Sequence, residues 1–264
     1  MRGKIIASIN NKGGVGKTTM TVNLAHALAN KKRKVLVVDS DSQSNATSLL
    51  LRPDLITDSL YELLQGDIDD PGRAIYPTSY TNLSCLPNVE ETAALEFDLS
   101  KDLPQNYYLL KNKLREYVNE NFDYTIIDCP PNLGFFVLNS LYAADFGIVP
   151  TLCGSAFSLE GLVKAIKFID EIQETGNPNL KFLRLLVNVV DKRTAMSKII
   201  IDQLEKNFGP DRMFSTKIGI STQFEQAEYL RKTILRYAPR SSGASSYRAL
   251  AKEVALILDD NLEQ

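Results

Sequence analysis

The sequence has few of the residues that mark secreted, metal-binding and membrane proteins. Its 264 residues include three cysteines, one histidine and no tryptophan. Cys85, Cys129 and Cys153 lack the spacing of metal ligands, and so sparse a set is typical of reduced thiols in a cytosol. No apolar run approaches the roughly 20 residues of a membrane-spanning helix. With a net charge of −2, the whole chain has no electrostatic preference for nucleic acid, so any such contact requires a local basic patch.

Short apolar runs alternate with amphipathic stretches along the chain. The length fits one α/β domain over residues 1–264, with neither a secretory leader nor a helix-turn-helix module before the first strand. Continuous apolar runs predict buried parallel strands, and the amphipathic stretches predict helices, so we expect a mostly parallel twisted sheet flanked by helices on both faces. The predicted strands are 5–9, 35–38, 124–127, 146–149 and 183–190, and helical patterns include 109–118 and 159–172. Residues 67–104 are predicted to form surface loops around a short strand at 83–86.

A glycine-rich segment between two lysines follows the first predicted strand and opens a helical pattern. Strand, tight loop and helix form the context in which such a loop binds phosphate groups. The glycines let backbone N–H groups approach the phosphates, Lys17 adds a positive charge, and the Thr18 hydroxyl can bind Mg²⁺. The sequence therefore predicts a nucleoside triphosphate site formed by Lys12, Gly13, Gly14, Val15, Gly16, Lys17, Thr18 and Thr19.

Aspartates stand where two further predicted strands end. Asp39 and Asp41 follow the second strand, and Asp128 follows the strand at 124–127. Ligands of parallel sheets bind at the carboxyl ends of the strands, so we expect these carboxylates beside the glycine-rich loop. Asp128 could hold a Mg²⁺-bound water there, whereas helix capping is the simpler alternative for all three aspartates.

The glycine-rich loop is not of the ordinary kind, because Asn11 occupies the position of the first glycine and Lys12 stands next to it. In this form it resembles the deviant Walker A box of the ParA/MinD family of ATPases. Residues 39–47, DSDSQSNAT, are similar to a second box of ParA proteins, in which Ser42 and Ser44 here replace a proline and a glycine. Both replacements are expected to loosen the turn.

The resemblance spans residues 4–255 and implies an ATPase in which two subunits enclose two ATP molecules. Lys12 would reach the phosphates of the partner subunit, and Lys17 would contact those of its own subunit. Asp41 would position the attacking water with support from Asp39. The catalytic set implied by the family is therefore Lys12, Lys17 and Asp41.

The same resemblance implies ATP and Mg²⁺ as cofactors. Thr18, Asp41 and Asp128 would surround the metal ion. The adenine would lie near Asn188, at the end of the last long strand, and near the loop at 217–221.

The C-terminal part of the chain decides between DNA and membrane as the surface that such a dimer would bind. Residues 231–252 carry six basic residues and no acidic one, which fits phosphate contacts, although a merely solvated face is the alternative. ParA-like members bind DNA without sequence preference. By resemblance, the candidate DNA contacts are Lys192, Arg193, Lys198, Arg231, Lys232, Arg236, Arg240, Arg248 and Lys252.

MinD-like members instead end in a basic amphipathic helix that lies on a membrane. Here the last helical pattern, 244–260, has an apolar stripe typical of core packing, and the tail at 259–264 is acidic. We therefore predict a short ParA/Soj-type partitioning ATPase, cytoplasmic and nucleoid-associated, that forms an ATP-dependent homodimer and responds to a ParB-like adaptor. A MinD-like regulator and a metabolic or assembly ATPase of the same superfamily stay open as alternatives.

Overall fold

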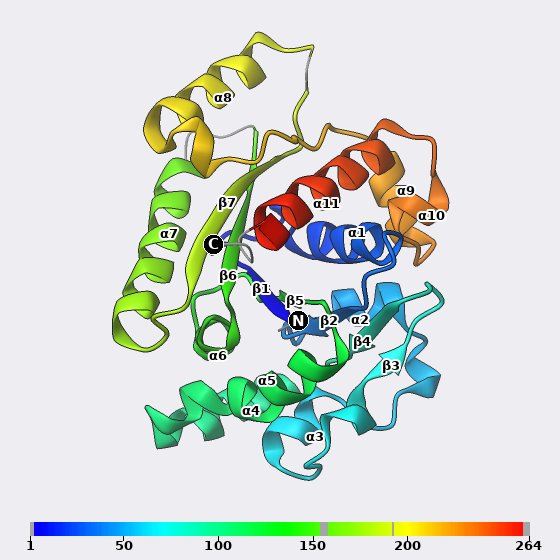
Figure 1. Cartoon of the computed structure of the whole chain (residues 1–264), viewed down its shortest axis with the longest axis vertical. Coiled ribbons are helices and arrows are strands. Elements are labelled where there is room, and N and C mark those ends of the chain that lie inside the picture. Colours follow the sequence, from blue (N-terminus) through cyan, green and yellow to red (C-terminus); the bar gives the residue numbers. More distant parts are fainter. Residues whose placement is uncertain (1–2, 154–157, 192, 261–264) are drawn as a thin grey trace.

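A seven-stranded sheet forms the centre of the molecule in the computed structural model, which describes residues 3–153, 158–191 and 193–260. The strand order is β3-β4-β2-β5-β1-β6-β7, and helices cover both faces (Figure 1). Every neighbouring pair is parallel except β3 with β4. The strands are β1 (Lys4–Ser8), β2 (Val35–Asp39), β3 (Tyr76–Pro77), β4 (Leu83–Leu86), β5 (Tyr124–Asp128), β6 (Phe146–Leu152) and β7 (Lys181–Asn188).

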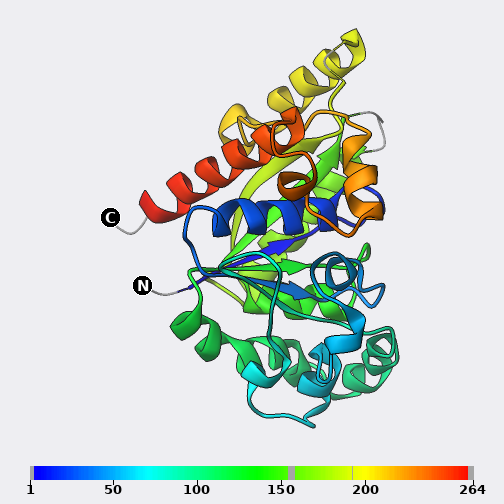
Figure 2. The same cartoon turned by 90° about the vertical axis from the view of Figure 1, so that its right-hand side faces the viewer.

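Helices lie on the two faces because successive strand residues point to opposite sides. Ile6 packs in the cluster that contains the apolar residues of α1 and α11, whereas Ile5 packs in the cluster under α5, α6 and α7. Figure 2 shows α1 and α11 together on one side of the sheet and α5 on the other. The helices are α1 (Lys17–Ala29), α2 (Asn45–Leu50), α3 (Leu60–Gln65), α4 (Thr92–Leu99), α5 (Leu109–Asn121), α6 (Phe135–Ala143), α7 (Ser158–Thr175), α8 (Ala195–Phe208), α9 (Gln223–Tyr229), α10 (Ile234–Tyr237) and α11 (Ser242–Asp260).

The predicted α/β architecture is confirmed, and each predicted strand exists with ends shifted by at most three residues. The predicted loops of residues 67–104 were wrong in part, because this stretch also contains α4 and the edge strand β3. Leu95 and Ala74 from this stretch are buried in the core. Packing against the sheet, rather than a strong local pattern, stabilises these short elements.

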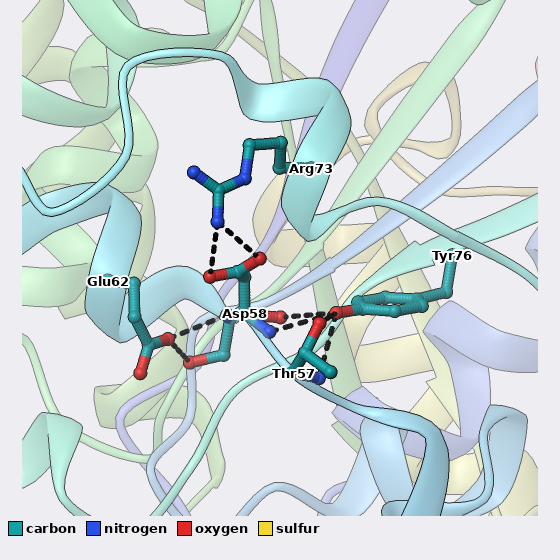
Figure 3. A network of polar contacts seen from close by, with 6 residues as sticks. Thr57, Asp58, Glu62, Arg73 and Tyr76 are labelled. Carbon is teal, nitrogen blue, oxygen red and sulfur yellow. Dashed lines mark hydrogen bonds and ion pairs between the residues drawn. The ribbon is translucent and has the colours of Figure 1, made fainter.

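Polar contacts fix the outer part of this stretch to the chain before it (Figure 3). The Tyr76 hydroxyl accepts hydrogen bonds from the backbone N–H groups of Thr57 and Asp58 at 3.0 and 2.9 Å. The Arg73 guanidinium forms an ion pair with Asp58 at 3.2 Å, and Glu62 accepts from the backbone N–H of Ser59 in the capping box that starts α3. The edge of the sheet at β3 is thereby held in a defined position.

The apolar stripe of α11 packs into the core, as predicted. Tyr247, Leu250, Ala251 and Val254 are at most 1% exposed, in the cluster that contains α1. This face is therefore not available to lie on a membrane. Across residues 3–153, 158–191 and 193–260, no helix combines the length and the apolar character that crossing a membrane requires.

A mostly buried ion pair between Arg115 and Asp145 joins α5 to the start of β6. The guanidinium donates to both carboxylate oxygens at 2.9 and 2.8 Å, and Asp145 also accepts from the backbone N–H of Ile5. We expect Asp145→Ala to lower the free energy of unfolding by about 3 kcal/mol, because the substitution leaves a mostly buried cation without its carboxylate and the N–H of Ile5 without this acceptor. Urea titration followed by circular dichroism measures this change.

Asp54→Ala, which breaks an exposed ion pair with Arg52, is the control and should leave stability unchanged. Equal effects of the two substitutions would contradict this prediction.

Candidate nucleotide site

The carboxyl ends of β1, β2 and β5 lie level with one another in the sheet. In the strand register Ser8 of β1 is opposite Asp128 of β5, and Asp128 is opposite Asp39 of β2. The glycine-rich loop begins at Lys12, four residues after the end of β1, and leads into α1 at Lys17. Parallel pairing thus brings the loop and both strand-end aspartates to one edge, as the sequence predicted.

The glycine-rich loop forms a compact turn before α1. Gly14 and Gly16 have positive φ angles of 71° and 85°, which side chains other than glycine adopt only at a cost. Neither the Cβ position of Gly13 nor that of Gly14 has a neighbouring atom within 4 Å, so the loop presents open backbone on this side. Such a loop at a helix N-terminus is an anion-binding arrangement.

Lys17, the first residue of α1, is 7% exposed and points back into the loop. Its Nζ donates to the carbonyl oxygens of Asn10 and Lys12 at 3.2 and 3.3 Å. Burial lowers the pKa of Lys17, whereas Asp128 and Asp41 raise it. The lysine therefore lies near both carboxylates, in the position from which its charge can meet a phosphate group.

Asn10 is a site residue that the sequence did not point to. Its Oδ1 accepts from the backbone N–H of Lys12 at 3.0 Å, and its Nδ2 donates to the carbonyl of Pro150 at 2.8 Å. The amide thereby attaches the start of the loop to β6. An asparagine at a strand end does not by itself indicate a role in a site. Its contact with Pro150 can be seen only in the folded structure.

Asp128 carries the strongest electrostatic constraint in the site. It is 1% exposed, Thr21 donates to its Oδ1 at 3.2 Å, and its Oδ2 has no hydrogen-bond partner among the described residues. Burial and the charge of Asp39 raise the pKa of Asp128, whereas the Thr18 hydroxyl lowers it. A buried carboxylate oxygen without a partner, beside a threonine hydroxyl, can bind Mg²⁺ or accept a hydrogen bond from one of its bound waters.

Asp39 and Asp41 have different roles in the structure. The Asp39 carboxylate is fully buried and accepts from the backbone N–H of Asp41 at 3.2 Å and from the N–H and hydroxyl of Thr47 at 2.8 Å. Burial raises the pKa of Asp39, although these hydrogen bonds oppose the shift. Asp39 therefore organises the turn that presents Asp41, which is 8% exposed and accepts from the N–H of Gln43 at 3.0 Å.

One of the two serines in the turn after β2 has a left-handed backbone. Ser44 has φ 52° and ψ 34°, in the left-handed region, and its N–H donates to the carbonyl of Asp41 at 2.9 Å. Ser44 therefore adopts a backbone that suits glycine, at a cost of about 1 kcal/mol, and the loosening of the turn stays a prediction.

A pocket of about 250 Å³ opens beside the glycine-rich loop. Asn188 is 4% exposed, donates to the carbonyl of Val15 at 2.8 Å, and has a buried Oδ1 without a hydrogen-bond partner among the described residues. Of the loop at 217–221, which the resemblance predicts near the adenine, residues 218–221 line this pocket and Lys217 does not; α9 and Tyr247 were not foreseen there. The lining residues are Gly14, Gly16, Thr19, Asn188, Val189, Ile218, Gly219, Ile220, Ser221, Phe224, Glu225, Glu228 and Tyr247.

The candidate DNA contacts among the described residues are exposed but do not all lie together. Six of them belong to the segment that runs from the end of α9 into α11, whereas Lys198 lies on α8, separate from it (Figure 1). Arg193 forms an exposed ion pair with Asp191, and Lys192 falls outside the described residues. We call this part of the chain the basic segment; its basic residues are Arg231, Lys232, Arg236, Arg240, Arg248 and Lys252.

Fold and site together define a P-loop nucleotide-binding protein. The model of a family described as "AAA domain" matches residues 3–182. The chain is 37% identical over 254 residues to the sporulation initiation inhibitor protein Soj of Bacillus subtilis, with 96% of this chain and 98% of that protein covered. It is 34% identical over 253 residues to the chromosome partitioning protein ParA of Myxococcus xanthus, covering 96% and 88% of the two chains.

Solved structures agree with this relationship. Cobyrinic acid a,c-diamide synthase from Mycobacterium smegmatis, with bound ADP and magnesium, superposes with a TM-score of 0.84 at 30% identity, covering 98% and 96% of the two chains. MinD from Pyrococcus horikoshii, complexed with Mg-ADP, gives 0.76 at 26% identity and covers 97% of each chain. The chain belongs to the ParA/MinD family of P-loop ATPases, close to its Soj and ParA members.

Asp128 should destabilise the nucleotide-free protein. Its pKa is raised in the fold, so this group costs the fold nothing below the pKa of the unfolded chain; the cost grows as pH rises and is complete above the folded pKa. Asp128→Asn should therefore raise the free energy of unfolding at pH 7 by about 2 kcal/mol and abolish stabilisation by Mg²⁺–ATP. Thermal unfolding with and without Mg²⁺–ATP, at pH 6 and pH 8, measures both effects. An Asp128→Asn protein that is less stable than its parent, or that Mg²⁺–ATP still stabilises, would contradict this prediction.

Ser44→Gly should stabilise the fold by about 1 kcal/mol, because glycine relieves the left-handed backbone. Ser42→Gly is the matched control: its backbone lies outside that region, so the added freedom of the unfolded chain should lower stability slightly. Chemical unfolding compares the two variants with the parent. A Ser44→Gly protein no more stable than Ser42→Gly would show that the turn carries no such strain.

Proposed function

We propose that this chain is a ParA-type partitioning ATPase that uses ATP with Mg²⁺. The observation that carries the proposal is the convergence of the glycine-rich loop, Asp41 and Asp128 at one edge of the sheet, in a chain that aligns with Soj over nearly its full length. Reduced to its chemistry, the reaction is attack of water on the γ-phosphorus with release of ADP as the leaving group.

The residues of the site divide the work of hydrolysis among them. Lys17, which contacts the start of the loop, would neutralise charge on the phosphates of its own subunit, and Asp41, held by the turn that Asp39 organises, would position the attacking water. Thr18 and Asp128 would hold the metal ion, which would neutralise phosphate charge when bound with ATP. In a homodimer, Lys12 supplies a further cation to the partner's phosphates, so hydrolysis is slow until the dimer forms.

The base of the nucleotide would lie in the pocket between Asn188 and α9. The Oδ1 of Asn188 needs a donor, and the exocyclic amino group of adenine is one. Since α9 forms a wall of this pocket and leads directly into Arg231 and Lys232, the nucleotide and the basic segment share one element.

The ATP dimer would bind DNA without sequence preference through the basic segment, with Lys198 as a further contact, and a ParB-like adaptor would release it by stimulating hydrolysis. Such a protein is cytoplasmic and associated with the nucleoid, where it segregates or positions a plasmid, a chromosome or a protein cargo. The burial of the α11 stripe argues against the MinD-like alternative. Structural similarity to cobyrinic acid a,c-diamide synthase keeps a metabolic ATPase as the second candidate.

DNA binding by Asp41→Ala, mixed with random-sequence duplex and either ATP–Mg²⁺ or ADP–Mg²⁺ over a salt series, tests the proposal. We expect binding with ATP only, with an affinity that falls steeply as salt increases. Arg236→Ala in this background should lower affinity and reduce the slope of log affinity against log salt by about one, whereas Lys101→Ala, on the opposite side of the sheet, should change neither. Absence of DNA binding in both nucleotide states would refute the nucleoid-binding function and direct attention to small-molecule substrates.

A further inference from the structure

Buried polar groups hold the start of α10 against α1. The Oδ1 of Asn23 accepts from the backbone N–H of Ile234 at 2.7 Å, and the Nδ1 of His26 lies 2.6 Å from the Thr233 hydroxyl. Tyr80 stacks on His26, and its hydroxyl accepts from the N–H of Thr233 at 3.2 Å. We call Asn23, His26, Tyr80 and Thr233 the α1–α10 clamp. Asn23, His26 and Thr233 are 4, 7 and 1% exposed, so these bonds are shielded from water.

The clamp reaches the phosphate-binding loop at its other end. The Nδ2 of Asn23 donates to the carbonyl of Thr19 at 2.8 Å, and Thr19 lines the nucleotide pocket. Thr19 and Asn23 also line a small crevice together with Lys232 and Ile234. One side chain, that of Asn23, therefore contacts both the first turn of the loop's helix and the first residue of α10.

The clamp also sets the position of the basic residues on either side of it. Arg231 and Lys232 directly precede Thr233, and Arg236 lies within α10. With only four residues, α10 has little helical stability of its own, so its place depends on what it contacts. Arg231, with φ 50°, closes the end of α9 by donating to the carbonyl of Glu228.

Burial and neighbouring positive charges favour a neutral His26. Burial, Arg236 and Arg248 together lower the pKa of His26 to about 4. At neutral pH the ring is uncharged and adds no repulsion to the neighbouring guanidinium groups. The contact between His26 and Thr233 is thus compatible with the nearby guanidinium groups of Arg236 and Arg248.

We propose that Asn23 and His26 are positioning residues that connect the phosphate-binding loop to the basic segment, so that nucleotide binding at Thr19 fixes the DNA-contacting cations. This inference rests on the proposed DNA-binding function. Neither residue would contact the nucleotide phosphates or DNA. Removing the Asn23 side chain would leave the N–H of Ile234 buried and unpaired, and α10 would give up its position before the core is affected.

The test compares Asn23→Ala with its parent in the Asp41→Ala background. Three quantities are measured: affinity for a fluorescent ATP analogue, dimer formation with ATP by light scattering, and affinity for random-sequence duplex with ATP or ADP. We expect DNA affinity with ATP to fall about tenfold, while nucleotide affinity and dimer formation change less than about twofold. Asn23→Asp keeps the acceptor for Ile234 but loses the donor to the Thr19 carbonyl, so it should not restore the DNA affinity if the connection to the loop matters. His26→Ala should lower DNA affinity in the same direction.

Asn177→Ala is the matched control for a merely structural effect. Asn177 is also buried, at 3% exposed, and donates to the carbonyls of Leu141, Tyr142 and Ala144 away from α10. It should lower the unfolding temperature without changing DNA affinity.

The inference is wrong if Asn23→Ala binds DNA as its parent does, if it loses nucleotide affinity in parallel, or if Asn177→Ala weakens DNA binding equally. Failure of the parent to bind DNA at all would instead refute the proposed function on which the inference rests.

Discussion

The parallel pairing of β1, β2 and β5 is the constraint on which the site depends. It places Ser8, Asp39 and Asp128 level with one another, although they are separated by up to 120 positions in the chain. Once the strands are in register, the loop after β1 and the aspartates after β2 and β5 meet without further adjustment. A slip of one residue would turn each of these side chains to the opposite face of the sheet.

Charge burial is the cost of this arrangement. Asp39, Asp128 and Lys17 are removed from water within one small region. Burial raises the pKa of each aspartate and lowers that of the lysine, so it favours the neutral form of all three. Hydrogen bonds from Thr47 compensate Asp39, whereas Asp128 keeps an oxygen that nothing in the described part of the chain satisfies. A site built for a metal ion and a polyphosphate is therefore least stable without them, which couples ligand binding to stability.

The helix α1 links the two surfaces that the proposed function requires. Its first turn belongs to the phosphate-binding loop, and its middle contacts α10 through Asn23 and His26. The basic segment is therefore attached to the nucleotide site through the core of the protein. It is packed on the same helix whose N-terminus would bind the phosphates, and α9 joins the pocket to the cations directly.

Local pattern was sufficient for the glycine-rich loop, the strand-end aspartates and the α/β alternation, because glycine backbone freedom and continuous apolar strands leave direct traces in the sequence. Resemblance to a family added the roles of Lys12 and Asp41, which spacing alone leaves undecided between catalysis and helix capping. Asn10, the left-handed Ser44, the wall formed by α9 and the contacts of Asn23 and His26 required the tertiary structure. Asn10, His26 and Asn23 depend on partners 140 to 211 positions distant, and Ser44 depends on a backbone angle imposed by packing. The sequence around each residue gives no sign of either.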